Sequence, residues 1–311
     1  MLRLSLGMRR VGSEHHRSGW PWVMRSLEVV HSYQGIYFED FVDRTFTHGR
    51  RTNPYIKPWV GVFHNPHNMP PWFDWRQTPQ LVFQTRVFRE SLKHLKLAIA
   101  LSDYLGDWLR ENLEVPVIAT PHPTEVPATL FDPNMYLHNT RKKAIQVGWW
   151  LRNTDAIYQL KCPGQFQRTA LKLQERWVKE AESRVSEYWE ALGTRSYVDG
   201  VVDVKWIENA QYDKMLSRNV VFVEFFDSSA NNAVVECIAR NTPIIVNRHP
   251  AIEEYLGADY PLFYEKFSDA GDLFTDEQII KGHEYLRDMD MTRFTGAHFR
   301  SRIVEAVKGI T

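Results

Sequence analysis

The stretch that decides the fold is NVVFVEFFDSSANNAVVECIARNTPIIVNRHPAIEEYLG, residues 219–257. Its apolar run from Val220 to Phe226 has the composition of a strand and opens into the polar loop 227–232. A helical segment follows, and a second apolar strand begins at Pro243. This order predicts a strand–loop–helix–strand unit of an open α/β sheet, in which ligands bind at the loop that follows the strand.

The same segment carries a set of candidate binding groups. Glu236 lies in the predicted helix, after the loop residues Ser229, Ala230, Asn231 and Asn232. Backbone N–H groups of the loop and of the helix start suit a phosphate, and an acidic side chain suits sugar hydroxyls. The asparagines could instead only cap the helix, and Glu236 could lie on an exposed helix face. The segment as a whole predicts a nucleotide-sugar site.

Length and composition exclude several classes of protein. A chain of 311 residues fits two domains of about 150 residues each. Its 38 basic and 38 acidic residues give no overall field that would draw it to nucleic acid or a membrane. Two distant cysteines, Cys162 and Cys237, form no disulfide framework and indicate a reducing compartment. Without a long apolar run or a signal core, we expect a cytoplasmic protein with no transmembrane helix.

Strands and helices alternate on both sides of a linker at residues 124–142. In the second half, the apolar run 144–148 predicts a strand, and a long charged helix is expected from about Thr169 to Ala191. This alternation predicts two Rossmann-like, doubly wound parallel sheets that face a cleft. The expected parts are an acceptor-side domain, a donor-binding domain and a last helix that crosses back: residues 1–135, 143–290 and 291–311.

The chain resembles glycosyltransferases of the two-Rossmann GT-B fold, and among them the retaining family-4-like group. The motifs that carry the likeness are VGWWLRNTD at residues 147–155, the loop and helix at 228–236, and TPIIV at 242–246. The likeness covers most of the chain in architecture and is specific mainly over residues 144–257. It implies a hexosyl- or pentosyltransferase whose co-substrate is a nucleotide-diphosphate sugar, with no cofactor.

The resemblance also implies roles for single residues. Gly148 and Arg152 match the glycine and the basic residue that meet the donor diphosphate, although Arg152 could be an ordinary surface arginine. Glu236 matches the residue that binds the ribose hydroxyls, and the loop 229–232 would surround the phosphate or the sugar. One departure concerns Ser228, which stands where the group often carries a second glutamate. The identity of the donor sugar and the stereochemistry of transfer therefore stay open.

Two histidines of the first half, His64 and His67, follow the predicted strand that ends at Phe63. A histidine there can accept a proton from an attacking hydroxyl or donate a hydrogen bond to the sugar. Structural histidines of a loop are the alternative. No third ligand follows at metal spacing, so we expect no metal site.

A second polar loop, at the amino end of the chain, contains His16, Arg17 and Gly19. Arg17 could neutralise a phosphate, and Gly19 permits close backbone approach to a donor phosphate or an acceptor. A polar terminus without such a role is the alternative.

These features favour transfer of a sugar from a nucleotide diphosphate donor to the hydroxyl of a glycan or another acceptor. If the configuration is retained, the donor phosphate takes the acceptor proton; if it is inverted, His64 or His67 is the general base. A modified DNA base is an alternative acceptor, because five arginines lie within the first 25 residues. A nucleotide- or sugar-binding protein without catalysis is the third alternative, because Ser228 replaces an acid.

Overall fold

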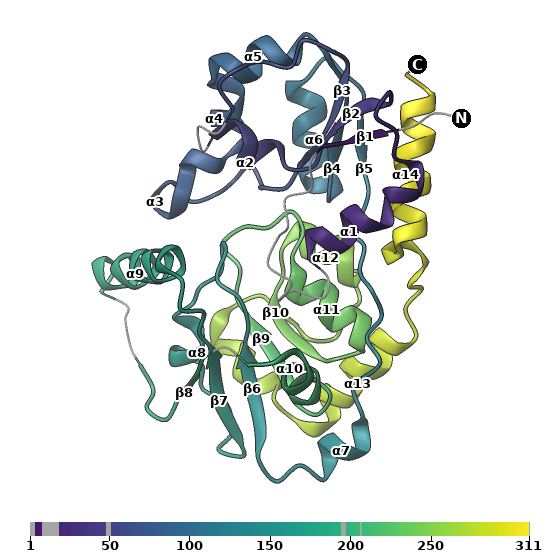
Figure 1. Ribbon diagram of the computed structural model, residues 1–311. Coiled ribbons are helices and arrows are strands. Elements are labelled where there is room, and N and C mark those ends of the chain that lie inside the picture. Colours follow the sequence, from purple (N-terminus) through teal and green to yellow (C-terminus); the bar gives the residue numbers. More distant parts are fainter. Residues whose placement is uncertain (1–3, 8–18, 48–50, 194–196, 206, 311) are drawn as a thin grey trace. The chain divides into compact units, whose positions relative to one another are not determined.

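The structure is a computed structural model that describes residues 4–7, 19–47, 51–193, 197–205 and 207–310. The chain forms two compact units, each built on a parallel sheet (Figure 1). The first unit consists of the described residues up to 125, of 228–232 and of those from 290 onward. The second unit consists of 126–227 and 233–289. The two parallel α/β sheets predicted from the sequence are confirmed.

The sheet of the first unit has five parallel strands whose spatial order follows the chain, β1-β2-β3-β4-β5. The strands are β1 (Leu4–Leu6), β2 (Ile36–Glu39), β3 (Trp59–Phe63), β4 (Leu95–Ala100) and β5 (Val117–Ala119). The α-helices are α1 (Trp20–Ser26), α2 (Val42–Thr47), α3 (Pro71–Asp74), α4 (Pro79–Gln84), α5 (Arg86–Leu92), α6 (Asp103–Asn112) and α14 (Gly296–Lys308). Short 3-10 helices are η1 (Glu28–Val30), η2 (Trp75–Gln77) and η4 (Thr292–Phe294).

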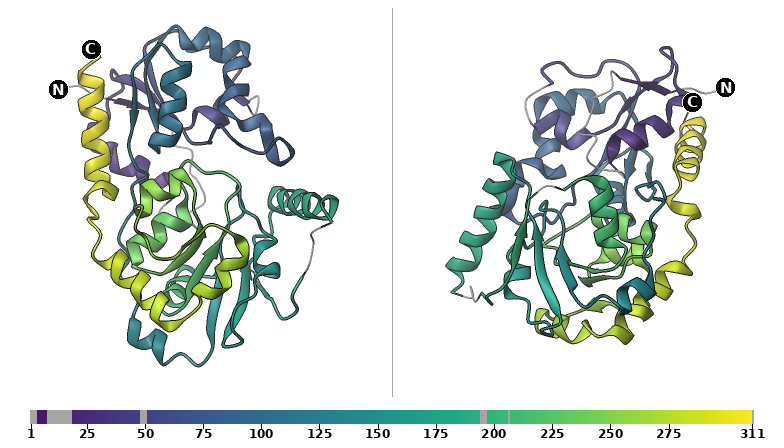
Figure 2. Two further views of the ribbon diagram at one scale, coloured as in Figure 1. Left: turned by 180° about the vertical axis from the view of Figure 1, so that it is seen from behind. Right: turned by 60° about the horizontal axis from the view of Figure 1, so that its bottom comes forward.

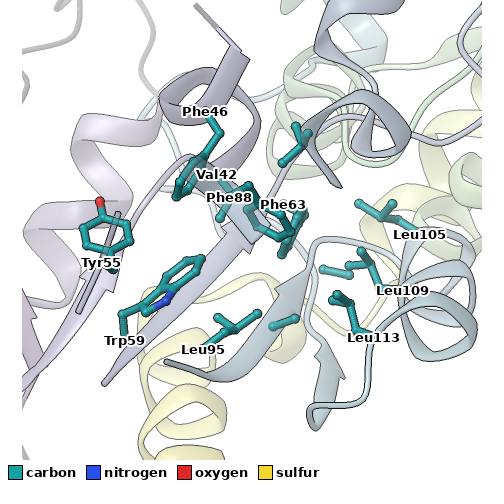
Figure 3. Close-up of a cluster of buried hydrophobic side chains, with 13 residues drawn as sticks. Val42, Phe46, Tyr55, Trp59, Phe63, Phe88, Leu95, Leu105, Leu109 and Leu113 are labelled. Carbon is teal, nitrogen blue, oxygen red and sulfur yellow. The ribbon is translucent and has the colours of Figure 1, made fainter. Parts of the chain in front are cut away.

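Apolar side chains cover both faces of this sheet, as a parallel sheet requires. One cluster joins the strands to α2, α4, α5 and α6 and is rich in aromatic rings, with Phe46, Trp59 and Phe88 near its centre (Figure 3). The other cluster joins the opposite face to α1 and to Phe299 and Ile303 of α14. Figure 2 shows α14 beside α1, so the last helix of the chain completes the core of the first unit.

The second unit has a six-stranded parallel sheet with the order β11-β10-β9-β6-β7-β8. The strands are β6 (Lys142–Gln146), β7 (Phe166–Leu171), β8 (Val202–Val204), β9 (Val220–Val223), β10 (Ile244–Asn247) and β11 (Phe263–Tyr264). The helices are α7 (Pro133–Leu137), α8 (Ala156–Gln159), α9 (Arg176–Ala191), α10 (Asn209–Leu216), α11 (Asn232–Arg240), α12 (Pro250–Leu256), η3 (Phe267–Leu273) and α13 (Asp276–Arg287). From β6 the chain builds outward to β8, then returns to β9 and builds outward the other way. This reversal makes the second sheet doubly wound.

The deciding stretch folds as its pattern predicts. All four residues of β9 and the first three of β10 are buried, because helices cover both faces of the sheet. The polar loop leads into α11, and α12 begins at Pro250, where proline is favoured in the first helical turn. Gly257 ends α12 with a φ of 88°, a backbone conformation that favours glycine.

One expected element was wrong. Residues 169–171, which we expected to begin the long helix, belong to β7, and the helix α9 starts only at Arg176. The pattern misleads because Gln167 and Arg168 interrupt the apolar residues of this strand near the sheet's edge. No helix among the described residues combines the length and apolar character needed to cross a membrane.

Candidate functional site

The order of the strands in the second sheet reverses between β6 and β9. Hydrogen bonds join the segments that follow β6, β9 and β10 at this point. The N–H of Asn153 donates to the carbonyl of Glu224 at 2.8 Å, and Arg152 forms an antiparallel bridge with Phe225. From β10, the amide of Asn247 donates to Phe225 O at 3.1 Å and accepts from Phe225 N at 2.8 Å. Ligands of open α/β sheets bind at such a reversal, outside the carboxyl ends of the strands.

The loop after β6 has a geometry that only glycine satisfies. Gly148 has a φ of 75°, and a Cβ atom there would lie 1.3 Å from Nη1 of Arg152. The buried amide of Gln146 shapes the same loop, because it donates to Thr154 O at 2.9 Å and accepts from Ile157 N at 3.1 Å. The guanidinium of Arg152 therefore lies directly against the glycine backbone.

Arg152 is almost fully buried, with 7% of its surface exposed. Burial lowers the pKa of its guanidinium to about 10, while the nearby Tyr212 and Glu236 oppose that shift. The side chain thus keeps its positive charge at neutral pH. A buried guanidinium offers paired donors to a diphosphate, which is the role predicted for this residue.

Glu236, on α11, is 5% exposed and lies within a network of charged groups. Its Oε2 accepts a hydrogen bond from the hydroxyl of Tyr212 at 2.8 Å and lies 3.9 Å from Nη1 of Arg240. Arg240 in turn forms an ion pair with Asp213 at 2.9 Å, which ties α11 to α10. Among the described residues, none bonds to Oε1 of Glu236. One carboxylate oxygen is therefore left for a ligand hydroxyl.

Arg152 and Glu236, predicted separately from the sequence, thus share one electrostatic environment within the second unit. Tyr212 interacts with both residues. Its hydroxyl donates a hydrogen bond to the carboxylate of Glu236, and it supports the charge of Arg152. Burial raises the pKa of Tyr212 well above the ordinary value. The sequence analysis did not single out Tyr212. A tyrosine on the helix before β9 carries no local signal of this contact.

Asp227, the acid beside Ser228, is committed to another part of the fold. It is 1% exposed, and its Oδ1 lies 3.0 Å from Nε2 of His249. The other ring nitrogen of His249, Nδ1, accepts from Ala251 N at 3.2 Å and so caps α12. Because Nδ1 accepts a hydrogen bond, Nε2 is the ring nitrogen that donates one to Asp227.

The loop of Ser229, Ala230, Asn231 and Asn232 belongs to the first unit. Ala230 packs against the apolar cluster that includes α14, and the hydroxyl of Ser229 lies 3.1 Å from that of Ser102. Asn231 is buried, and Asn232 is the first residue of α11. The predicted contact of these four residues with a donor stays a prediction.

Glu224 is a candidate that the sequence analysis missed. It follows the last residue of β9, and its Oε2 accepts from Nδ2 of Asn153 at 2.6 Å. The Oδ1 atom of Asn153 accepts in turn from Nε1 of Trp189 at 2.9 Å. Burial raises the pKa of Glu224 to about 7, so near neutral pH it can donate or accept a proton. The available signal was a lone carboxylate within the apolar run 220–226.

His64 lies in an aromatic pocket of the first unit. Its ring stacks on Phe41 at 3.9 Å between centroids and meets Trp20 edge-on at 4.4 Å. Nε2 donates to the carbonyl of Asp40 at 2.8 Å. Burial, with a smaller contribution from His122, lowers the pKa of His64 to about 3. The ring is therefore neutral at physiological pH and is a weak base.

His67 lies apart from this pocket. Its ring stacks on Trp108 of α6 at 5.7 Å and lies 4.6 Å from the ring of Tyr104. The two predicted histidines thus pack against different helices and aromatic groups, although only two residues separate them. His122 also neighbours Trp20, at 5.6 Å between ring centroids, and so lies on the same side as His64.

The remaining predictions concern the amino end and metals. His16 and Arg17 lie outside the described residues, as does most of the arginine-rich segment on which the nucleic-acid alternative rests. Gly19 precedes α1, and its carbonyl accepts from Trp22 N at 2.9 Å. Within the described ranges, no group of three acidic, histidine or cysteine side chains has the arrangement of a metal site.

Comparison with solved structures identifies the fold. Sucrose-phosphate synthase from Thermosynechococcus elongatus superimposes with a TM-score of 0.60 at 13% identity, over 93% of this chain and 77% of that one. The UDP-forming α,α-trehalose-phosphate synthase from Burkholderia xenovorans gives 0.55 at 11% identity, over 91% and 76%. Anabaena HepE in complex with UDP and glucose gives 0.56 at 12% identity, over 81% and 72%.

These likenesses confirm the predicted GT-B fold, with its two Rossmann-like parallel sheets. At 11–13% identity they concern the architecture of the chain. No protein-family model and no curated protein matches the sequence.

Proposed function

We propose that this protein is a glycosyltransferase that moves a sugar from a nucleoside diphosphate donor to an acceptor hydroxyl. The observation that carries the proposal is the proximity of a buried Arg152 to Glu236 beside the reversal of strand order in the second unit. This is the position at which open α/β sheets bind ligands, and the two side chains offer what a nucleotide sugar needs. The GT-B fold supports the same function by analogy.

In this proposal the second unit holds the donor. The guanidinium of Arg152 binds the diphosphate, and the backbone at Gly148 allows the phosphates to approach closely. Oε1 of Glu236 accepts a hydrogen bond from a ribose hydroxyl, while Tyr212 holds Oε2. When the bond between the anomeric carbon and the phosphate oxygen breaks, negative charge grows on the leaving diphosphate. Arg152 stabilises that charge from a fixed, water-poor position.

The low pKa of His64 argues against this residue as the general base of an inverting enzyme. With a pKa of about 3, His64 is too weak a base to remove a proton from an acceptor hydroxyl efficiently at neutral pH. A neutral His64 is better suited to hydrogen bonding. We therefore propose that an oxygen of the donor phosphate takes the acceptor proton. Proton NMR of the first-formed product distinguishes the two outcomes, since retention keeps the anomeric configuration of the donor and inversion reverses it.

The donor nucleotide is proposed to be uridine diphosphate. Support comes from two solved structures of the same fold, one described as a UDP-forming synthase and one as a complex with UDP and glucose. Transfer is proposed to need no metal ion, because Arg152 supplies positive charge at the diphosphate.

The test is release of nucleoside diphosphate from a panel of nucleotide sugars, beginning with UDP-glucose, with and without simple glycoside acceptors. We expect release from at least one donor, and loss of that release in Glu236→Gln. Binding of a donor without release of nucleoside diphosphate, under every acceptor condition, would instead support a protein that binds nucleotide sugars without catalysis.

A further inference from the structure

The second unit contains a cavity of about 560 Å³ at the amino ends of β6 and β7. It therefore lies at the edge of the sheet opposite to the carboxyl ends, where the proposed donor site lies. Its volume falls in the range of small-molecule sites, roughly 300–1,000 Å³. The side chains that define its chemistry are Arg141, Lys142, Gln165, Phe166, Gln167 and Arg168.

Positive charge dominates the lining. Lys142 is neutralised by Asp276, since Nζ lies 2.9 Å from the carboxylate. Arg168 donates to the backbone carbonyls of Leu160, Val198 and Asp199, and no described carboxylate forms a salt bridge with Arg168 or Arg141. The acidic side chain among the lining residues is Asp199, which is exposed. Two arginines without a carboxylate partner therefore face a cavity that carries one acid.

The walls of the cavity are fixed by backbone contacts. Phe166 N donates to Pro163 O at 2.9 Å and closes a tight turn that has Gly164 and Gln165 at its centre. The segment before this turn packs on η3, because a Cβ on Gly271 would lie 2.0 Å from the carbonyl of Lys161. A site whose walls are already ordered loses little conformational entropy when a ligand binds.

We propose that this cavity binds a small phosphorylated molecule that also carries hydroxyl groups, such as a sugar phosphate. Arg141 and Arg168 bind the phosphate, for which guanidinium groups are suited. The amides of Gln165 and Gln167 offer donors and acceptors to the hydroxyls. The site is separate from the donor site and does not depend on the proposed transferase activity.

Cys162 provides a direct reporter of occupancy. It lines the cavity and is half-buried, whereas Cys237, the other cysteine of the chain, is fully buried. Burial raises the pKa of Cys162, so labelling is slow but measurable near pH 8. A neutral reagent such as iodoacetamide avoids any effect of reagent charge on the rate.

The experiment measures the rate of Cys162 labelling, by mass spectrometry, in the presence of glucose 6-phosphate, inorganic phosphate, glucose or potassium chloride at matched ionic strength. We expect glucose 6-phosphate to slow labelling several-fold, inorganic phosphate to do so at higher concentration, and glucose and chloride to leave the rate unchanged. Thermal stabilisation is measured in parallel, because a bound ligand raises the melting temperature by mass action. Equal labelling rates and equal melting temperatures in all four solutions would overturn the proposal.

Two variants test where the ligand binds. Arg141→Gln should raise the concentration of glucose 6-phosphate needed for half protection about tenfold, because it removes one charge-assisted contact. Gly164→Phe adds a ring to a residue that lines the cavity and should weaken protection; a Cβ at Gly164 meets no atom within 4 Å, so the backbone accommodates a side chain at this position. Arg176→Gln, on the exposed surface of α9, is the matched control. Protection that is the same in all three variants would overturn the assignment to this cavity.

Discussion

At the scale of single residues, the arrangement around Glu236 explains how one carboxylate can be both buried and available. Tyr212 and Arg240 hold Oε2, and Arg152 compensates the charge from the neighbouring loop. A buried carboxylate without such partners would be strongly destabilising, because an unpaired buried charge is costly to desolvate. The network therefore fixes the side chain and leaves Oε1 for a ligand.

Replacing this carboxylate gives the first prediction. In Glu236→Gln, the amide oxygen can still accept from Tyr212, but Arg152 and Arg240 lose a buried counter-charge, so we expect the melting temperature to fall. Affinity for UDP should fall about tenfold, since a hydrogen bond to a charged group contributes roughly 1.5–3 kcal/mol. Isothermal titration calorimetry measures this loss. Glu208→Gln is the control, because Glu208 is an exposed acid just before α10 with no described side-chain partner; an equal loss there would contradict the assignment.

How far the site could be predicted differs from residue to residue. Arg152 and Glu236 follow recognisable local patterns, a strand that ends in glycine and a polar loop before a helix. Glu224 and Tyr212 do not, because their importance arises from burial and from partners distant in sequence, such as Asn153 and Glu236. The pKa of Glu224 in particular is raised only by its folded environment.

At the scale of elements, the strands with long apolar runs were predictable and those with mixed composition were not. β9 and β10 are buried on both faces, so their sequences are continuously apolar. β7 contains Gln167 and Arg168, whose side chains line the cavity at the amino edge, and this mixture imitates a charged helix. The strand whose start was mistaken for a helix is thus one whose polar side chains line a cavity.

The loop after β6 gives a prediction at the same scale. Gly148→Ala places a Cβ where Nη1 of Arg152 lies and forces a φ of 75° on a residue with a side chain. We expect the guanidinium to be displaced, with UDP affinity reduced by about tenfold or more and stability lowered by about 1 kcal/mol. Titration calorimetry and urea unfolding measure the two effects.

Gly164→Ala is the matched control in the same unit, because its Cβ would meet open space. If both alanine variants bind UDP as tightly as the unmodified chain, Arg152 does not depend on the glycine for its position, and the account of this loop fails.

At the scale of the whole molecule, the described part of each unit contains a carboxyl whose pKa burial raises. Burial raises the pKa of Asp43 in the first unit from 3.8 to about 7, and that of Glu224 in the second from 4.5 to about 7. Such groups hold a proton in the folded state that the unfolded chain releases. Both units should therefore respond to pH in the same direction.

These two groups should make the free energy of unfolding fall as pH rises from about 4 to about 7. Above pH 7 they should cause no further loss. Between those values unfolding releases a proton, so each group lowers the free energy of unfolding by up to about 1.4 kcal/mol per pH unit. Urea unfolding across the range measures the slope. Asp43→Asn should flatten this slope, because the amide does not titrate. The variant should keep its fold, because the amide oxygen can still accept from His64 N. An unchanged slope would show that Asp43 titrates normally.

The central claim is that the diphosphate of a nucleotide donor binds to Arg152 at the strand reversal of the second unit. The most direct test is calorimetric titration of UDP and UMP into the unmodified protein and into Arg152→Gln. The account predicts that UDP binds the unmodified protein about tenfold or more tightly than UMP, and that the variant nearly loses this difference, because the guanidinium contacts the second phosphate. The same ratio of affinities in both proteins, or no binding of either nucleotide to the unmodified protein, would contradict it.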